Sequence, residues 1–318
     1  MNVARAPWSS ASFLVYLGGL TVFASGFVLL AIESGEHGHA GFVLWSAIIL
    51  AAFLACAEGL RRTGHPVAAG LFAFNSVWAS VVFVGALENW FGWLANSDSP
   101  FGGFHPSLLL LELVALVGAV LALRVYRFPL LAGLAAAAGW FFATDLISNG
   151  GDWSAIVTIL VGLVLLAVGV AVDGGPSRPY GSWVHVVAGL TIGGGLLWFF
   201  HSSNFDWILI AIAALAYVAL GDRLLRSSWV VLAAWALLQV TTHFADKWAG
   251  LGAGGELFFP FSVFLAPFFG FGFGESGSGP NHLWAAPVSY AVLGFVFVAI
   301  GLFVARRRHD AIPAAELL

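Results

Sequence analysis

Glu112 is the residue whose type and position most directly suggest chemistry. It stands alone in the apolar run LLLLELVAL, where we predict a membrane-spanning helix. An ionisable side chain inside a membrane is costly, so it is by default a functional candidate. We expect Glu112 to couple protons to a solute or to gate its passage. A neutral acid that is hydrogen-bonded between helices is the structural alternative. Asn75 is a weaker polar candidate of the same kind.

A second set of polar residues gathers where apolar runs end, on the face that we predict to be the outer one. It includes Asp145 and the histidines His37, His39, His201 and His243. Imidazole and carboxylate groups bind divalent transition metals, and histidine also senses pH. No HxxxH or HExxH spacing occurs, so polar caps at the membrane interface are the alternative to a metal or pH-sensing site. An acidic mouth would concentrate cations and repel anions.

Tryptophans recur deep in alternate apolar runs. Trp140 and Trp198 occupy such positions, as do Trp78 and Trp235. If these side chains face a common solute pathway, they form an aromatic constriction in it. If they do not, they fill the packed interior of the helix bundle.

Composition decides the class of protein that positions these residues. Hydrophobic residues make up 60% of the 318 and charged residues only 9%, with a mean hydropathy of +0.95. Soluble domains carry about 25% charged residues, so this is a polytopic membrane protein in contact with the lipid bilayer. The only cysteine is Cys56, which excludes a disulfide framework and a thiolate metal cluster.

Ten apolar runs are near the roughly 20 residues that a membrane-spanning helix needs. We therefore predict one all-α transmembrane domain over 1–318, a bundle of about ten helices. Eleven of the twelve basic residues then fall on one side, Lys247 being the exception, so the positive-inside rule places both termini in the cytoplasm and the protein in the cell (inner) membrane. The predicted spans are 12–32, 41–59, 66–87, 106–125, 128–148, 153–172, 181–201, 204–221, 228–244 and 284–305.

Residues 249–283 are predicted to form an outer loop. Its segment Phe258–Gly274 holds eight phenylalanines and two prolines. We interpret this segment as a re-entrant or interfacial element. It is either an aromatic loop among the headgroups, a lid over a pore, or a surface for a partner subunit.

The runs also repeat as hairpins. Asp152-Trp153 recurs as Asp206-Trp207 at an offset of 54 residues, close to two spanning helices with their turns. The hairpin within 127–161 is the clearest copy, and chance matching within apolar sequence is the alternative to duplication.

Two short stretches resemble a known family. The run Ala57-Glu58-Gly59-Leu60-Arg61-Arg62-Thr63-Gly64, followed by Ala73-Phe74-Asn75-Ser76-Val77-Trp78-Ala79-Ser80, is similar to the second-to-third helix passage of the YaaH-type acetate and succinate transporters. The Arg-Phe-Pro hairpin at 127–172 resembles that family's last two helices. The family's opening Asn-Pro-Ala-Pro-Leu-Gly signature is replaced by Ala6-Pro7-Trp8-Ser9, and four further helices follow. The resemblance implies transport of a small carboxylate.

On architecture alone, ten helices in repeated hairpins resemble the TehA-like anion channels, in which five hairpins surround a pore.

The sequence therefore predicts a channel or transporter for a small solute, such as a small carboxylate or anion. Phosphate-binding loops, nucleophile elbows, zincin motifs and dinucleotide fingerprints are absent from the sequence, so we expect no enzyme, no cofactor and no nucleic-acid partner. A homo-oligomer would favour a channel. The alternatives are a non-catalytic membrane subunit that binds partner subunits, and a metal or pH sensor built on the outer histidines.

Overall fold

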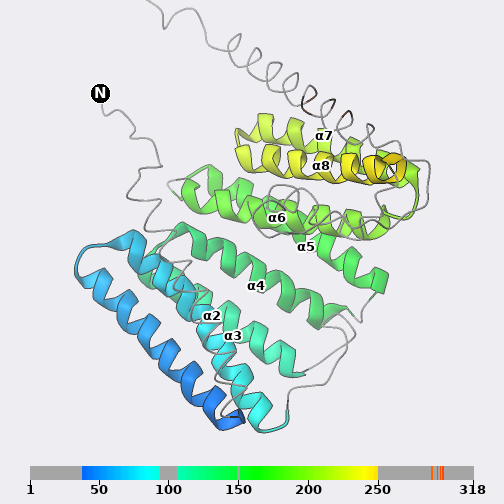
Figure 1. Ribbon diagram of the computed structural model, residues 1–318. Helices are drawn as coiled ribbons and strands as arrows, with labels where there is room; N and C mark the ends of the chain where they lie inside the picture. The colour runs from blue at the N-terminus through cyan, green and yellow to red at the C-terminus, as the bar shows by residue number, and fades with distance from the viewer. Residues whose placement is uncertain are drawn as a thin grey trace, which may run out of the picture. The chain divides into compact units, whose positions relative to one another are not determined.

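The computed structural model describes residues 38–93, 106–148, 151–175 and 177–249, with positions 288, 292, 294 and 296 (Figure 1). Apart from turns, this part of the chain is helical throughout. The predicted span 12–32 lies outside it, as do nearly all of 284–305 and of the loop 249–283. The helices are Gly38–Arg62, α2 (Pro66–Trp90), α3 (Pro106–Tyr126), α4 (Pro129–Ile147), α5 (Gly151–Asp173), α6 (Arg178–Phe199), α7 (Asn204–Leu224) and α8 (Ser227–Ala249).

Seven of these helices, all except α8, are long and apolar enough to cross a membrane. The chain is therefore a multi-pass membrane protein, and the predicted all-α class is confirmed for the described residues. The count of about ten spans and the side of each terminus stay predictions.

Local sequence determines where the helices begin and end. Proline opens α2, α3 and α4, a position where its missing N–H costs nothing because no helical partner exists for it. Arg127 and Leu225 take the left-handed conformation, with φ of 50° and 53°. A non-glycine residue rarely adopts this conformation, and here each one ends a helix within two residues of the start of the next. The hairpins α3–α4 and α7–α8 are consequently tight.

Ser203 caps the start of α7. Its hydroxyl accepts a hydrogen bond from the Asp206 N–H at 3.2 Å, and the Asp206 carboxylate accepts one from the Ser203 N–H at 2.8 Å. Ser203→Ala is expected to lower the free energy of unfolding by about 1 kcal/mol, because this reciprocal cap is lost. Thermal unfolding of purified protein in detergent measures the change. The exposed neighbour Ser202→Ala is the control, and an equal loss in both variants would contradict the capping role.

Contacts group the chain into two units, Met1–Gly195 and Leu196–Leu318. In the first unit, α3 packs between α2 and α4, and α4 also packs against α5 (Figure 1). Its hydrophobic core is formed mainly by α2, α3 and the α3–α4 turn with the start of α4. The buried members of that core are Ala57, Leu71, Ala73, Val77, Ala119, Ala122, Phe128, Leu131 and Leu134.

Glycines allow close contacts in this unit. Gly70 lies directly against the ring of Phe128. A Cβ at Gly162 on α5 would lie 2.5 Å from the Thr191 hydroxyl on α6. Small residues at helix contacts are the usual way in which membrane helices approach each other, because lipid provides little hydrophobic driving force for their association.

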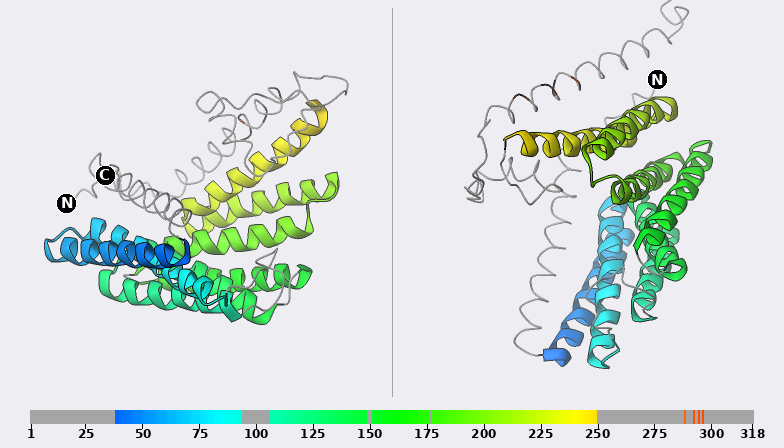
Figure 2. Two further views of the ribbon diagram at one scale, coloured as in Figure 1. Left: turned by 60° about the horizontal axis from the view of Figure 1, so that its bottom comes forward. Right: turned by 90° about the vertical axis from the view of Figure 1, so that its right-hand side faces the viewer.

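In the second unit, α7 and α8 run side by side as a hairpin (Figure 2). The two helices meet along two adjoining groups of buried side chains. These are Ala214, Ala233 and Leu237 in one group, and Trp207, Ile210 and Val240 in the other.

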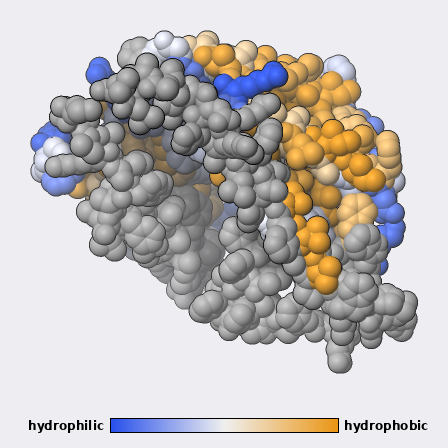
Figure 3. Space-filling view, turned by 90° about the horizontal axis from the view of Figure 1, so that it is seen from above, coloured by the Kyte–Doolittle hydropathy of each residue, from blue (hydrophilic) through white to orange (hydrophobic). Residues whose placement is uncertain are grey.

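Large apolar side chains also point outward. On α5, Leu160, Leu163 and Val164 are exposed. Much of the described surface in the view of Figure 3 is hydrophobic. Outward-facing apolar helices are typical of lipid contact, since polar groups are costly in the hydrocarbon region.

Candidate functional site

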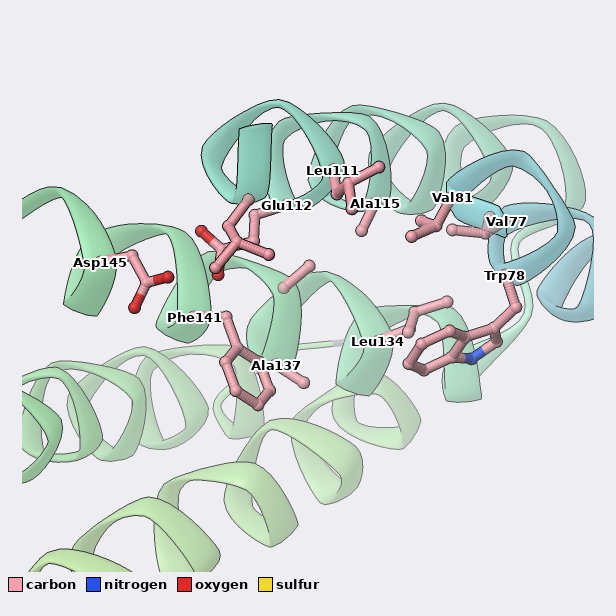
Figure 4. Close-up of a pocket in the computed structure, with 12 residues that line it drawn as sticks. Val77, Trp78, Val81, Leu111, Glu112, Ala115, Leu134, Ala137, Phe141 and Asp145 are labelled. Carbon is pink, nitrogen blue, oxygen red and sulfur yellow. The ribbon is translucent and has the colours of Figure 1, made fainter. Parts of the chain in front are cut away.

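The candidate site is a cavity of about 350 Å³ within the first unit. Three helices line it, and all but a few of their side chains there are aliphatic or aromatic (Figure 4). The lining residues are Val77, Trp78 and Val81 from α2, Leu108, Leu111, Glu112 and Ala115 from α3, and Leu134, Ala137, Ala138, Phe141 and Asp145 from α4.

The two ionisable residues of the lining lie together. Glu112 and Asp145 are 33 positions apart in the sequence, yet their side chains lie near each other in the lining of the cavity, one from α3 and one from α4. Figure 4 shows both carboxyl groups toward one end of the cavity, with Trp78 toward the other. We refer to Glu112 and Asp145 as the acid pair.

Helix geometry brings the acid pair to one level. Only Arg127 and Phe128 separate α3 from α4, so the two helices run in opposite directions from a common turn. A Cβ at Gly139 would lie 3.7 Å from the Leu116 side chain, which fixes the register of the two helices. Glu112 precedes Leu116 by four residues on α3, and Asp145 follows Gly139 by six residues on α4. These separations are roughly 6 and 9 Å along the helix axes, and both lead away from the α3–α4 turn.

The closeness of the two carboxyl groups bears on their charge. Two ionised carboxylates side by side repel each other, and a hydrogen bond between two carboxyl groups requires a proton on at least one of them. Asp145 is only 8% exposed, and the Oε2 atom of Glu112 is buried with no hydrogen-bond partner. Buried polar atoms are normally satisfied, so this oxygen is available to a donor in the cavity.

Glu88 adds a third buried acid at the same end of the three helices. A Cβ at Gly85 of α2 would lie 3.7 Å from the Leu111 side chain of α3, so these two residues lie at the same level. Glu88 follows Gly85 by about one helical turn, in the direction that leads away from the α3–α4 turn. Glu88 is 3% exposed, and its Oε2 atom has no hydrogen-bond partner. Among the described residues of α2, α3 and α4, the acids are therefore confined to the end opposite that turn.

This arrangement suits reversible binding of a cation or a proton. Two carboxyl groups that share a proton can release it or take up another as the local environment changes. The apolar lining around them screens charge less than water does, which strengthens their interaction with any positive group that enters. The remainder of the cavity offers contacts to an apolar surface.

The other residues singled out from the sequence lie elsewhere. Trp140 is on α4, but its indole N–H donates to the Thr158 hydroxyl of α5 at 3.1 Å. Trp198, near the end of α6, is 53% exposed. Asn75 is buried in α2. None of the three is among the residues that line the cavity. An aromatic constriction formed by Trp140 and Trp198 stays a prediction.

The histidines of the predicted outer mouth have separate partners. His39 Nδ1 accepts from the Asn89 amide at 3.1 Å, and His201 Nδ1 donates to the Trp198 carbonyl at 2.9 Å. His243 stacks on Trp207, with ring centroids 4.6 Å apart. His37 lies outside the described residues. Where side chains are described, no group of three or more His, Cys, Asp or Glu is placed to hold a metal ion.

Sequence reasoning did not single out Glu88, which is buried near this end of the three helices but is not among the residues that line the cavity. The residue is followed closely by Trp90, and this acid–tryptophan pattern indicated a helix end at the interface rather than a buried acid. The apolar residues that precede it in VGALENW were the signal that could have indicated a buried acid.

Comparisons of the chain with protein-family models, with curated proteins and with solved structures found no match.

Proposed function

We propose that this membrane protein moves a small solute across the bilayer, and that the acid pair couples this movement to protons. One observation carries the proposal: Glu112 and Asp145 lie near each other in an apolar cavity of a membrane protein. Ionisable residues within membrane helices are expensive to maintain, and they typically mark ion pathways and proton relays. The proposed role is that of a channel or transporter and is not enzymatic.

The depth of the acid pair supports this role. Glu112 is six residues after the first residue of α3, and Asp145 is two residues before the last residue of α4. Rises of 1.5 Å per residue place them roughly 9 and 3 Å from those helix ends. A proton from the nearer aqueous side therefore has a short path to the pair, while the apolar part of the cavity extends away from it.

The acid pair also bears on the charge of the solute. An ionised carboxylate in the pair would repel anions, so a small carboxylate such as acetate would enter this cavity as its neutral acid. Protons and cations are attracted instead.

Basic residues support an orientation for the protein. All described arginines lie at the connections that follow the Gly38–Arg62 helix, α3, α5 and α7. We place these connections in the cytoplasm by the positive-inside rule, which leaves the acid pair near the outer face of the cell membrane. The arginines are Arg61, Arg62, Arg124, Arg127, Arg178, Arg223 and Arg226.

Reconstitution in liposomes tests the proposal. Acetate, chloride or hexylammonium is added under an imposed pH gradient, and a trapped dye reports the internal pH. The wild-type protein is expected to raise the initial rate of pH change for at least one of the three solutes, after the rate in empty liposomes is subtracted. Rates equal to those of empty liposomes for all three would contradict the proposed transport.

A further inference from the structure

We infer that His185 and Asp173 form a second proton-binding site within the helices of the first unit, on the side opposite to the acid pair. Neither residue is among those that line the cavity. The inference rests on the proposed function, because it assigns to these two residues the exchange of the coupled proton with the aqueous side nearest the described arginines.

A hydrogen bond joins the two side chains across α5 and α6. His185 Nε2 lies 3.0 Å from Asp173 Oδ2. The imidazole is fully buried, while the Asp173 side chain is 19% exposed. One proton lies between an imidazole nitrogen and a carboxyl oxygen that are hydrogen-bonded, whichever of the two groups carries it. The carboxyl group of this histidine–aspartate pair therefore connects a buried imidazole to the protein surface.

Two glycines position the histidine–aspartate pair. A Cβ at Gly169 on α5 would lie 2.9 Å from the His185 ring, so the imidazole lies directly against the α5 backbone. Gly181 on α6 lies directly against Asp173 Oδ1. Small residues let membrane helices approach closely, and here they leave room for the imidazole and the carboxyl group between two backbones. Backbone atoms of both helices thus hold the pair in place.

Few other charged groups are described near this pair. The remaining acid of α5, Asp152, and the only acid of α4, Asp145, are near the opposite ends of these helices. Arg178 begins α6, seven residues or roughly 10 Å before the histidine of the pair. The Tyr180 hydroxyl donates to the Arg127 carbonyl at 2.8 Å, which places a second arginine at this end. The carboxyl group of the pair is therefore the only described acid at this end of α4, α5 and α6 that can stabilise a positive charge on the imidazole.

The histidine–aspartate pair and the acid pair lie at different depths. A Cβ at Gly133 of α4 would lie 3.1 Å from the Trp183 Cβ of α6, so these two residues are at the same level. Both helices lead away from the arginine-bearing connections that precede them. Asp145 follows Gly133 by twelve residues, or roughly 18 Å, whereas His185 follows the same level by two residues, or roughly 3 Å. Roughly 15 Å thus separates the two sites along the helices, and each is near one aqueous side.

Uptake of a proton changes the charge of the histidine–aspartate pair by one. With one proton, the imidazole and the carboxyl group together carry one net negative charge. With two protons, an imidazolium and a carboxylate form a neutral ion pair, and only N–H and O–H bonds form or break in the exchange. Histidine ordinarily makes this change between roughly pH 5 and 8. Ionisable residues within membrane helices typically mark proton relays, which is the role assigned to this pair.

Nuclear magnetic resonance of the imidazole tests the inference directly. His185 is the only histidine that follows a valine, so carbonyl-¹³C valine combined with ¹⁵N histidine identifies it in the wild-type protein in lipid nanodiscs. Its ring nitrogens are expected to change from the neutral to the charged form within roughly pH 5 to 8. Asp173→Asn is expected to move this change to lower pH, because the carboxylate that stabilises the imidazolium is lost. The exposed acid Asp152→Asn is expected to leave it in place. An imidazole that keeps one charge over this range, or that responds equally to both substitutions, would overturn the inference.

Transport separates proton exchange from a merely structural hydrogen bond. His185→Gln keeps an N–H donor for Asp173 but cannot take up a proton. The variant is expected to melt at the wild-type temperature in detergent and to lose the solute-dependent change of internal pH in liposomes. His65→Gln, which changes an exposed histidine at the arginine-bearing connection before α2, is expected to keep the wild-type rate. A wild-type rate in His185→Gln would overturn the role in proton exchange.

The proton-binding site and transport can fail separately. If His185 titrates as described but no solute moves in liposomes, the site stands and transport is wrong. If solute moves equally in the wild type and in His185→Gln, transport stands and the second site is wrong.

Discussion

The double substitution Glu112→Gln with Asp145→Asn is expected to abolish the solute-dependent change of internal pH in liposomes. Each amide has nearly the shape of the acid it replaces and can still form hydrogen bonds, but it cannot bind and release a proton. Each single substitution is expected to lower the initial rate at least about tenfold, because the remaining carboxyl group has lost the partner with which it shares a proton.

Asp152→Asn provides the matched control for this experiment. Asp152 lies in the first turn of α5, is exposed and does not line the cavity. Its loss removes one negative charge without changing the acid pair, and the wild-type rate is therefore expected. Wild-type rates in the double variant would exclude the acid pair from proton coupling.

Gly195→Leu is expected to have the largest effect on stability. A Cβ at Gly195 on α6 would lie 3.1 Å from the Ala155 carbonyl oxygen of α5, and nearer still to the Ile159 side chain. The Ala155 oxygen belongs to the backbone and cannot move without displacing the helix. Overpacking of this kind typically costs about 1–3 kcal/mol, and a four-carbon side chain against backbone lies at the upper end.

The adjacent glycine is the control. Gly194 is exposed, and a Cβ there would meet no atom within 4 Å. Gly194→Leu is therefore expected to keep the wild-type melting temperature in detergent, while Gly195→Leu is expected to lower it or to prevent recovery of folded protein. Equal melting temperatures for the two variants would show that the contact between α5 and α6 is looser than described.

Helix existence and boundaries follow well from the sequence within the described residues. The predicted span 128–148 corresponds to α4 (Pro129–Ile147), and 66–87 corresponds to α2 (Pro66–Trp90). Length and apolar content decide that a segment spans, and proline at a helix start is a local signal. Both are properties of a few neighbouring residues, so one sequence is enough to read them.

The acid pair could be predicted only in part. Glu112 and Asp145 each stood out as polar residues, but we expected Glu112 within the membrane and Asp145 at its outer mouth. Their contact depends on how far α3 is shifted along α4, which the two-residue turn and the Leu116–Gly139 contact determine. Such a register involves residues that are distant in the sequence, and no local pattern specifies it.

The direction in which a tryptophan points is harder still to predict. A helix that is apolar on every side, as these are, lacks the polar stripe that would show which face is inside. Trp140 and Trp78 occupy similar depths in the sequence pattern, yet Trp78 lines the cavity and Trp140 donates to Thr158. Rotation of each helix about its axis decides between these outcomes.

The two-residue turn between α3 and α4 also has a consequence for the synthesis of the protein. A lone acid raises the cost of inserting a nascent helix, by about 2.5–3.5 kcal/mol at the helix centre and by less toward its end. Because only Arg127 and Phe128 separate the helices, α3 and α4 are constrained to leave the translocon together as a hairpin. Glu112 can then meet Asp145 before either side chain faces lipid. The same contact that forms the site thereby lowers the barrier to inserting the hairpin that carries it.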